Sequence, residues 1–260
     1  YEFAVNGKMM RSPTVKERIS FKGIEHYAAI PRGDVGVIGC SAHFGSWEVL
    51  GPAVSLVGWR LNSVARGVDT GILDRYLRSL REVNGQRIIS FQGAIKQVRR
   101  ILQRGGNLAF VADQHAPINR LWVPFFGIPC GLIKTPAGMA RRFNTSLNIG
   151  LCRRIGLDYR FEVEFFPSIL PDPNLSVRED IARMTQAYAN CLEAHVRKYP
   201  EDYLWLFRIW RKPVNGEEYI GGDGTYVRHA TFGPDGVEAT ADPRALQPGA
   251  SRPAGEGDRA

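Results

Sequence analysis

The chain has 260 residues, of which 44% are hydrophobic, so it can bury the core of one sizeable domain. Its 34 Lys and Arg outnumber its 26 Asp and Glu, which gives a formal net charge of +8. This excess suits nucleic acid, anionic lipid or a phosphate-bearing substrate, and charge alone does not choose among them. No apolar stretch approaches the ~20 residues that span a bilayer. No spacing of a disulfide framework or a zinc site is present, which indicates reduced thiols at Cys40, Cys130, Cys152 and Cys191.

The first half of the chain alternates predicted strands with predicted helices. Short apolar runs predict strands at residues 35–40, 61–65, 87–90 and 107–112. Apolar residues at helical spacing predict helices at residues 47–57, 71–84 and 94–103. This alternation is typical of an α/β sheet with crossover helices.

The second half continues this pattern after an irregular stretch. Residues 115–134 are rich in Pro, Gly and aromatic residues and are predicted to form a long loop. Thr135-Pro136 opens another helix, and Ser176 with Glu179 forms a capping-box pattern that starts a helix to about residue 198. Strands are predicted at 146–153 and 159–166. The fold class is therefore α/β, with a mixed, largely parallel central sheet flanked by helices.

The chain is expected to divide into a folded domain over residues 1–215 and a disordered tail over residues 216–260. Large aliphatic residues are scarce in the tail, where Gly, Pro, Ala and charged residues dominate. Such a composition cannot bury enough apolar surface to offset the entropy of ordering.

A histidine follows the first predicted sheet strand and precedes a predicted helix. This His43 sits at a strand-to-helix turn, where open α/β sheets usually place their chemistry. Glu48 follows five residues later, and on one regular helix the two side chains would point ~140° apart. They can cooperate only if His43 precedes the helix and Glu48 reaches back; otherwise another acid serves His43. A neutral imidazole supported by a carboxylate is a general base, although a lone histidine is also often a structural one.

Polar side chains also follow three other predicted strands. Arg66 follows 61–65, Asp113-Gln114-His115 follows 107–112, and Arg153-Arg154 closes 146–153. Any one of these could be an ordinary surface group. Together they predict a crevice at the carboxyl ends of the strands.

These motifs resemble the lipid A biosynthesis lauroyl/myristoyl acyltransferases, which are related to the mycobacterial phosphatidylinositol mannoside acyltransferases within the lysophospholipid acyltransferase-like superfamily. The resemblance runs from about residue 20 to 213 and implies a glycerolipid acyltransferase-like fold. The residues that carry it are His43-Phe44-Gly45-Ser46-Trp47-Glu48 (an HxxxxE box), Arg66, Arg81 with Gly85, Gly105 through Asp113-Gln114, Val123-Pro124-Phe125-Phe126-Gly127, and Tyr199-Pro200-Glu201-Asp202-Tyr203-Leu204-Trp205.

The resemblance implies transfer of a fatty acyl group from acyl carrier protein or acyl-CoA to a hydroxyl of a glycolipid such as a lipid A precursor. It implies no metal and no cofactor besides that thioester co-substrate. The partners it implies are the acyl donor, the glycolipid acceptor and the cytoplasmic face of the inner membrane, and not nucleic acid. It also implies that an upstream membrane-anchor segment is missing from these residues.

Roles follow for the site residues under this resemblance. His43 would act as general base without a covalent acyl-enzyme, supported by Glu48, with Asp113 as the rival for that role. Arg66 and one of Arg153 or Arg154 would hold phosphate of the acceptor or donor, because guanidinium groups suit phosphate. Together with Gln114, Arg66, Arg153 and Arg154 are the expected substrate-binding residues. Backbone N–H groups near Gly45, or an arginine, would stabilise the oxyanion.

Two features leave alternatives open. Near Phe207 and Ile209 the family usually carries a His and a second Arg, and their replacement here allows a catalytically silent lipid-binding protein of the same fold. The apolar residues 122–128 would either line an acyl-chain channel or meet the membrane interface, or pack in the core under a loop. The resemblance favours the first reading. Nucleic-acid binding rests on charge alone, because the motifs of the common binding modules are absent.

Overall fold

The computed structural model describes residues 9–12, 14–30, 35–65, 71–82, 85–90, 94–232 and 239–241. Its helices, including two short 3₁₀ helices (η1 and η3), are η1 (Val15–Arg18), α2 (Ile24–Ala28), α3 (Trp47–Leu56), α4 (Gly71–Arg81), α5 (Ala94–Leu102), α6 (Thr135–Phe143), α7 (Val177–Lys198) and η3 (Pro200–Asp202). Its strands are β1 (Ile19–Lys22), β2 (Ile38–Ser41), β3 (Leu61–Ala65), β4 (Arg87–Ser90), β5 (Asn107–Val111), β6 (Arg120–Phe125), β7 (Ile128–Ile133), β8 (Leu147–Ile155), β9 (Arg160–Phe165), β10 (Tyr219–Ile220), β11 (Tyr226–Val227), β12 (Ala230–Phe232) and β13 (Ala239–Ala241).

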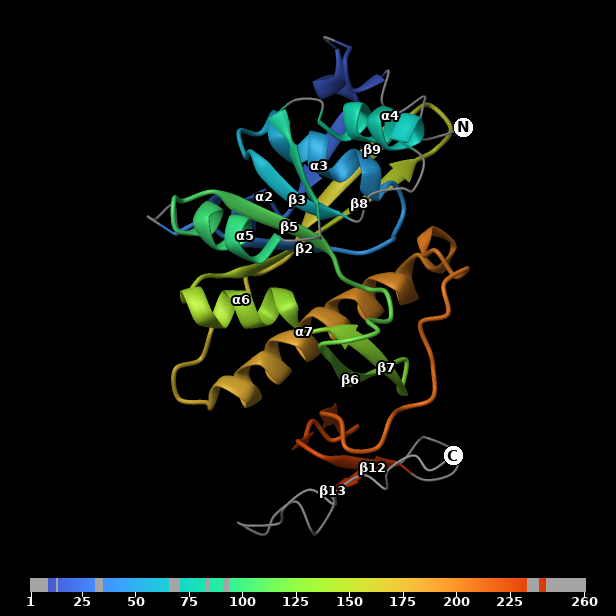
Figure 1. The fold of residues 1–260 in the computed structure, drawn as a ribbon. Helices are drawn as coiled ribbons and strands as arrows, with labels where there is room; N and C mark the ends of the chain where they lie inside the picture. Colours follow the sequence, from blue (N-terminus) through green and yellow to red (C-terminus); the bar gives the residue numbers. More distant parts are fainter. Residues whose placement is uncertain are drawn as a thin grey trace, which may run out of the picture.

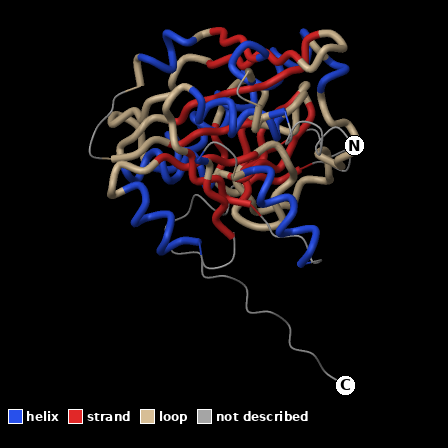
Figure 2. The backbone as a smooth tube through the Cα atoms, turned by 90° about the horizontal axis from the view of Figure 1, so that it is seen from above, coloured by secondary structure: helices blue, strands red, loops and turns tan. Residues whose placement is uncertain are grey.

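The main sheet has seven strands in the order β1-β9-β8-β2-β5-β3-β4. Adjacent strands in this sheet run parallel, except for β8 and β9, which are antiparallel and are joined by a tight turn. Figure 2 shows strands crossing the middle of the molecule, with helices on several sides of them. The predicted α/β class with a largely parallel sheet is confirmed.

Helices cover both faces of this sheet. In Figure 1, α3 and α4 lie on one side of it, and α6 with the long α7 lies on the other. The start of α7 is fixed by the predicted capping box, in which the Ser176 hydroxyl accepts from the Glu179 N–H and the Glu179 carboxylate accepts from the Ser176 N–H. The Tyr188 hydroxyl of α7 donates to the Ser41 carbonyl at 2.9 Å, which joins this helix to the end of β2.

The segment 115–134 differs from the long loop expected from its composition. It contains the antiparallel hairpin β6–β7, whose two-residue turn is Phe126-Gly127 with φ of 54° and 75°. Positive φ at both positions is the geometry of a tight hairpin turn, and Phe is an unusual residue to adopt it. Trp122, Val123 and Phe125 are buried and pack in the core, whereas Ile128 is exposed. An acyl-channel or membrane-interface role for residues 122–128 stays a prediction.

Residues 216–232 also differ from the expected disordered tail. β10 pairs parallel with β6, and Tyr219 and Ala230 are buried against Trp122. Aromatic side chains supply here the apolar area that aliphatic residues do not. Residues 233–238 and 242–260 lie outside the described residues, so the expectation of disorder stays a prediction there.

Candidate active site

The site lies where the carboxyl ends of β2, β5 and β8 meet. β2 is the central strand of the three and runs parallel to both neighbours. Ser41 at the end of β2 pairs with Val111 at the end of β5, so His43 and Asp113 each follow their strand by two residues at the same edge. Gly45 forms a parallel bridge with Cys152 of β8. Three of the strand ends from which a crevice was predicted thus lie on adjacent strands.

Asp113 holds His43 through two hydrogen bonds. The His43 ring Nδ1 lies 2.7 Å from Asp113 Oδ1, and the His43 backbone N–H donates to Asp113 Oδ2 at 2.9 Å. The carboxylate is buried, with 2% of its side chain exposed, while 17% of the imidazole remains exposed. A carboxylate that accepts from Nδ1 keeps the proton on that nitrogen and leaves the Nε2 lone pair free to act as a base.

The free edge of the imidazole is bordered by one amide and two aromatic rings. Gln114 Nε2 lies 3.4 Å from His43 Nε2. The rings of Trp47 and Phe207 approach the imidazole edge-on, with centroids at 5.1 and 4.9 Å. The reactive nitrogen therefore faces a largely apolar setting with a single amide beside it.

The turn after His43 is held by neighbouring backbone. Gly45 has φ of 51°, and a Cβ added there would lie 2.4 Å from the Cys152 carbonyl oxygen, so only glycine fits. The Gly45 N–H donates to the Asp202 carbonyl at 2.6 Å, and the Ser46 N–H donates to the Cys152 carbonyl at 2.8 Å. The turn is anchored on both sides, which keeps the imidazole in place.

Glu48 does not reach the imidazole in this structure. It sits in the first turn of α3, and its carboxylate accepts two hydrogen bonds from Arg81 of α4, at 2.8 Å from Nε and 2.6 Å from Nη2. These hydrogen bonds raise the pKa of the Arg81 guanidinium. Of the two carboxylates considered for supporting His43, Asp113 makes the contact, and Glu48 joins α3 to α4.

Two of the predicted phosphate-binding arginines make contacts within the protein. Arg153 Nε donates to Asp202 Oδ2 at 3.1 Å, and its guanidinium lies 3.6 Å from the centroid of the Tyr199 ring. Arg154 donates to the Leu157 carbonyl in the β8–β9 turn. Arg153 therefore borders the site through its neighbours Gly45 and Asp202, whereas Arg154 contacts the β8–β9 turn. Arg66 lies outside the described residues, so its predicted role is untested.

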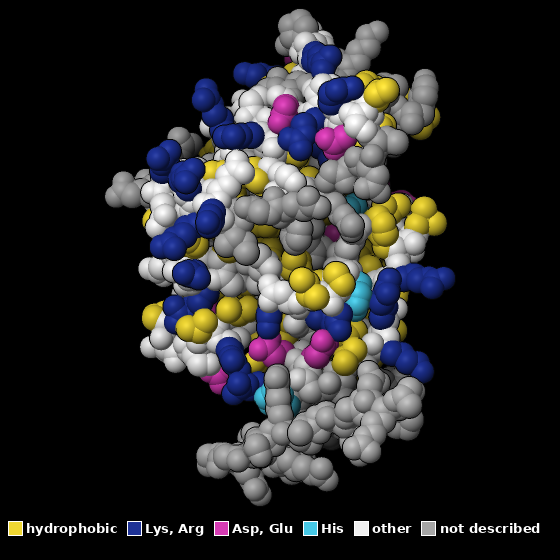
Figure 3. All heavy atoms as spheres, viewed as in Figure 1, with side chains coloured by type: hydrophobic (Ala, Val, Ile, Leu, Met, Phe, Trp, Pro, Cys, Tyr) yellow, Lys and Arg dark blue, Asp and Glu magenta, His cyan; other side chains and the backbone are white. Residues whose placement is uncertain are grey.

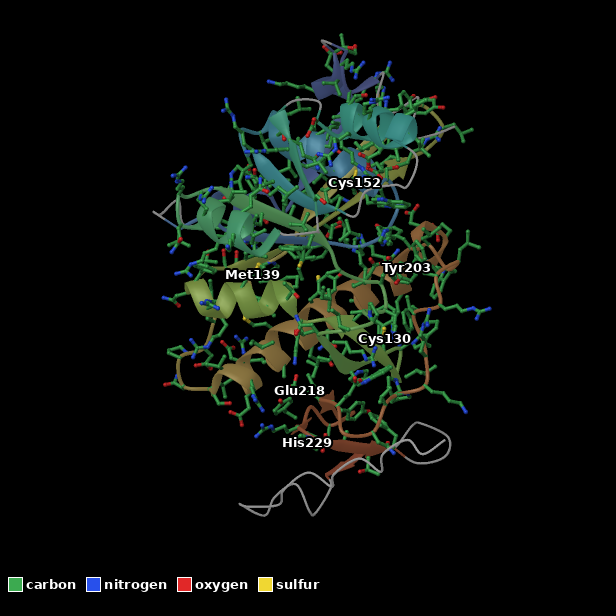
Figure 4. All side chains as sticks on the ribbon, in the orientation of Figure 1. Cys130, Met139, Cys152, Tyr203, Glu218 and His229 are labelled. Carbon is green, nitrogen blue, oxygen red and sulfur yellow. The ribbon has the colours of Figure 1, made fainter. Side chains whose placement is uncertain are left out.

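Tyr203 is buried, and although it belongs to the motif at 199–205, no role of its own was predicted for it from the sequence. Burial and the nearby Asp113 carboxylate raise the pKa of the Tyr203 hydroxyl, which keeps it protonated as a hydrogen-bond donor to that carboxylate. Figure 4 labels Tyr203 beside the C-terminal end of α7. Its signal in the sequence is the segment 199–205, in which polar and aromatic residues follow the helix directly.

The described residues include no group of three or more His, Cys, Asp or Glu side chains arranged to hold a metal ion. Burial raises the pKa of the Cys130 thiol and of the Cys191 thiol, each to about 12, which disfavours their thiolates at neutral pH. Burial also raises the pKa of Cys40 and Cys152. The arrangement is therefore suited to a histidine–aspartate pair that accepts a proton, rather than to a cysteine nucleophile.

A protein-family model matches most of the chain. The family model described as bacterial lipid A biosynthesis acyltransferase matches residues 4–212, well over half of the chain. No curated protein sequence matches the chain. The matched range contains β2, β5 and β8 and all residues of the site above, and it ends before β10.

Proposed function

Because the chain belongs to the bacterial lipid A biosynthesis acyltransferase family and is therefore an acyltransferase, we propose that it moves a fatty acyl group from acyl carrier protein or acyl-CoA to a hydroxyl of a glycolipid such as a lipid A precursor. The observation that carries this proposal is the 2.7 Å contact between His43 Nδ1 and the buried Asp113 carboxylate. It orients Nε2 as the base that such a transfer needs.

The proposed reaction is a direct transfer. The acceptor hydroxyl gives its proton to His43 Nε2 as its oxygen attacks the thioester carbonyl carbon, and a tetrahedral oxyanion forms. The Asp113 carboxylate stabilises the resulting imidazolium. Collapse breaks the carbon–sulfur bond, and His43 returns the proton to the leaving thiolate. The products are an ester and a free thiol, and no acyl-enzyme forms.

Gln114 is the best placed donor for the substrate oxygens among the described residues. The N–H groups of Gly45 and Ser46, which the sequence suggested for the oxyanion, already donate to carbonyls of Asp202 and Cys152. The Gln114 side chain is exposed and its amide lies next to His43 Nε2. We assign it a substrate-binding role, in which its N–H donates to the oxyanion or to the acceptor oxygen.

An exposed surface next to the site supports a membrane location. Trp205, Leu206 and Phe207 are exposed large apolar side chains, and Phe207 touches the imidazole edge-on. Exposed basic residues follow them at Arg208, Arg211 and Lys212. Figure 3 shows many exposed Lys and Arg side chains on the molecule, with apolar side chains exposed between them. Exposed apolar side chains followed by cations suit an anionic bilayer surface, and we propose that the enzyme works at the cytoplasmic face of the inner membrane, where thioester donors are made.

Within the described part of the chain, no helix combines the length and the apolar character needed to cross a bilayer.

The test is a donor and acceptor matrix in detergent micelles. A labelled long-chain acyl group, carried as a thioester on either CoA or acyl carrier protein, is the donor. Each donor is mixed with a lipid A precursor or with a lysophospholipid, and the products are identified by mass spectrometry. The proposal predicts one additional ester on the glycolipid with at least one donor, and none with His43→Ala. Transfer to the lysophospholipid alone would contradict the glycolipid assignment.

A further inference from the structure

Glu217 joins the segment beyond the family match to the hairpin that follows the site. Its carboxylate accepts three hydrogen bonds: from Arg120 Nε at 2.8 Å, from Arg120 Nη2 at 2.9 Å and from Trp122 Nε1 at 2.6 Å. Burial raises the pKa of the Glu217 carboxyl, but the hydrogen bonds from Arg120 and Trp122 lower it by more, so the net shift of this pKa is downward. Glu217 is thus held as a carboxylate in a specific geometry.

Arg120 continues this chain of contacts toward the site. While its Nε and Nη2 donate to Glu217, its Nη1 donates to the carbonyls of Ala116 and Pro117, at 3.1 and 2.7 Å. Only 14% of the Arg120 side chain is exposed. The guanidinium therefore fixes the backbone two and three residues after Gln114.

The backbone between Gln114 and Arg120 is fixed on its other side by β7. His115 forms an antiparallel bridge with Leu132, and the Ala116 N–H donates to the Gly131 carbonyl at 2.9 Å. The His115 ring also lies 5.5 Å from the Trp122 ring, centroid to centroid. Gln114 is the first residue before this fixed stretch, so its direction depends on it.

We propose that Glu217 is a positioning residue for acyl transfer, which acts through Arg120 on the backbone of residues 115–117 and so holds the Gln114 amide beside His43. The inference rests on the substrate-binding role proposed above for Gln114. It gives the segment 213–232, which lies outside the matched family range, a part in the reaction.

The test compares Glu217→Gln with the matched variant Glu218→Gln. The substitution at 217 keeps the side-chain length but replaces one acceptor oxygen by an N–H donor that faces Arg120 or Trp122. Glu218 lies on the same segment (labelled in Figure 4) and contacts Lys134 instead of Arg120, so its substitution makes the same charge change without touching this chain of contacts.

Steady-state kinetics of both variants are measured alone and combined with Gln114→Ala. We expect Glu217→Gln to lower kcat by about tenfold, which corresponds to one well-placed interaction in the transition state, and Glu218→Gln to leave it within about twofold. On the Gln114→Ala background, Glu217→Gln should have almost no further effect, because both act through one group. Equal kcat in the two single variants, or full multiplication of the two effects, would overturn the proposal.

Hydrogen exchange of the Ala116 amide supplies a readout that needs no substrate. Its hydrogen bond to Gly131 should open more often in Glu217→Gln, with exchange at least about tenfold faster than in the wild type and in Glu218→Gln. Unchanged exchange would overturn the link between Glu217 and this backbone. If Glu217→Gln fails to fold, Glu217→Asp, which keeps the charge, takes its place in both measurements. A wild type that transfers no acyl group would refute the proposed function, and the exchange result would still decide whether Glu217 orders this backbone.

Discussion

Replacing Asp113 by Asn separates the two partners that the carboxylate serves. Asp113 accepts from both the backbone N–H and the ring Nδ1 of His43, at 2.9 and 2.7 Å. Asn has one acceptor oxygen and one NH₂ donor. If its oxygen serves the backbone N–H, its NH₂ faces Nδ1 and forces the ring proton onto Nε2. The base is then lost, although the shape of the site is kept.

The magnitude follows from this tautomer change. A carboxylate-to-amide replacement behind a catalytic histidine lowers kcat by about 10⁴-fold, and we expect Asp113→Asn to lower it by about 10³- to 10⁴-fold, or about 4 to 5.5 kcal/mol of activation free energy. Acyl transfer is measured at saturating donor, with circular dichroism and thermal melting as checks of folding. Glu48→Gln is the control, because it weakens the ion pair with Arg81 without touching the imidazole. Its decrease in kcat should be at least about tenfold smaller than that of Asp113→Asn. A rate for Asp113→Asn within tenfold of the wild type, or a larger loss of rate in Glu48→Gln, would show that Asp113 is not the carboxylate that supports His43.

Two further predictions concern the surface and the thiols. Leu206→Asp should weaken flotation with anionic vesicles by about tenfold, because it places a carboxylate in the apolar surface next to the site, while Leu157→Asp should leave flotation unchanged. The two side chains are equally exposed, at 88% and 86%, but Leu157 lies in the β8–β9 turn; equal losses would contradict the placement of the surface. Because burial raises the pKa of Cys130 to about 12 and also raises the pKa of Cys40, iodoacetamide at pH 8 should leave both unmodified by peptide mass mapping and activity intact. Rapid alkylation of Cys130 with loss of transfer would point to a cysteine nucleophile.

Most strands of the main sheet were predictable because their signals are local, but the edge strand β1 was not predicted. The boundaries of β3 and β4 agree with the predicted strands, and the capping box at Ser176 starts α7 as predicted. The hairpin β6–β7 was missed because Phe126 adopts a positive φ in its turn, and no residue pattern in the sequence predicts this. The order at residues 216–232 was missed because it depends on a tertiary partner, the buried ring of Trp122.

The site was predictable only in part, for the same reason. The alternation of elements predicts that His43 and Asp113 lie at the same edge of a parallel sheet. It does not predict that β2 and β5 are neighbours, because β3 and β4 lie between them in the chain. Sequence spacing could not decide whether Asp113 or Glu48 supports His43. That outcome depends on Arg81, which lies 33 residues beyond Glu48 and hydrogen-bonds to its carboxylate. The engagement of Arg153 by Asp202 is likewise a contact between segments 49 residues apart.

The most direct test of the central claim is a single-turnover measurement with enzyme in excess over a radiolabelled acyl thioester, in micelles that contain the glycolipid acceptor. Wild type and His43→Ala are compared after thermal melting has shown that both are folded. Direct transfer with His43 as the base predicts that label passes from the thioester to the lipid with the wild type and stays on the thioester with His43→Ala, with no label on protein in either. Transfer by His43→Ala at the wild-type rate, or label bound to the wild-type protein before it reaches the lipid, would contradict it.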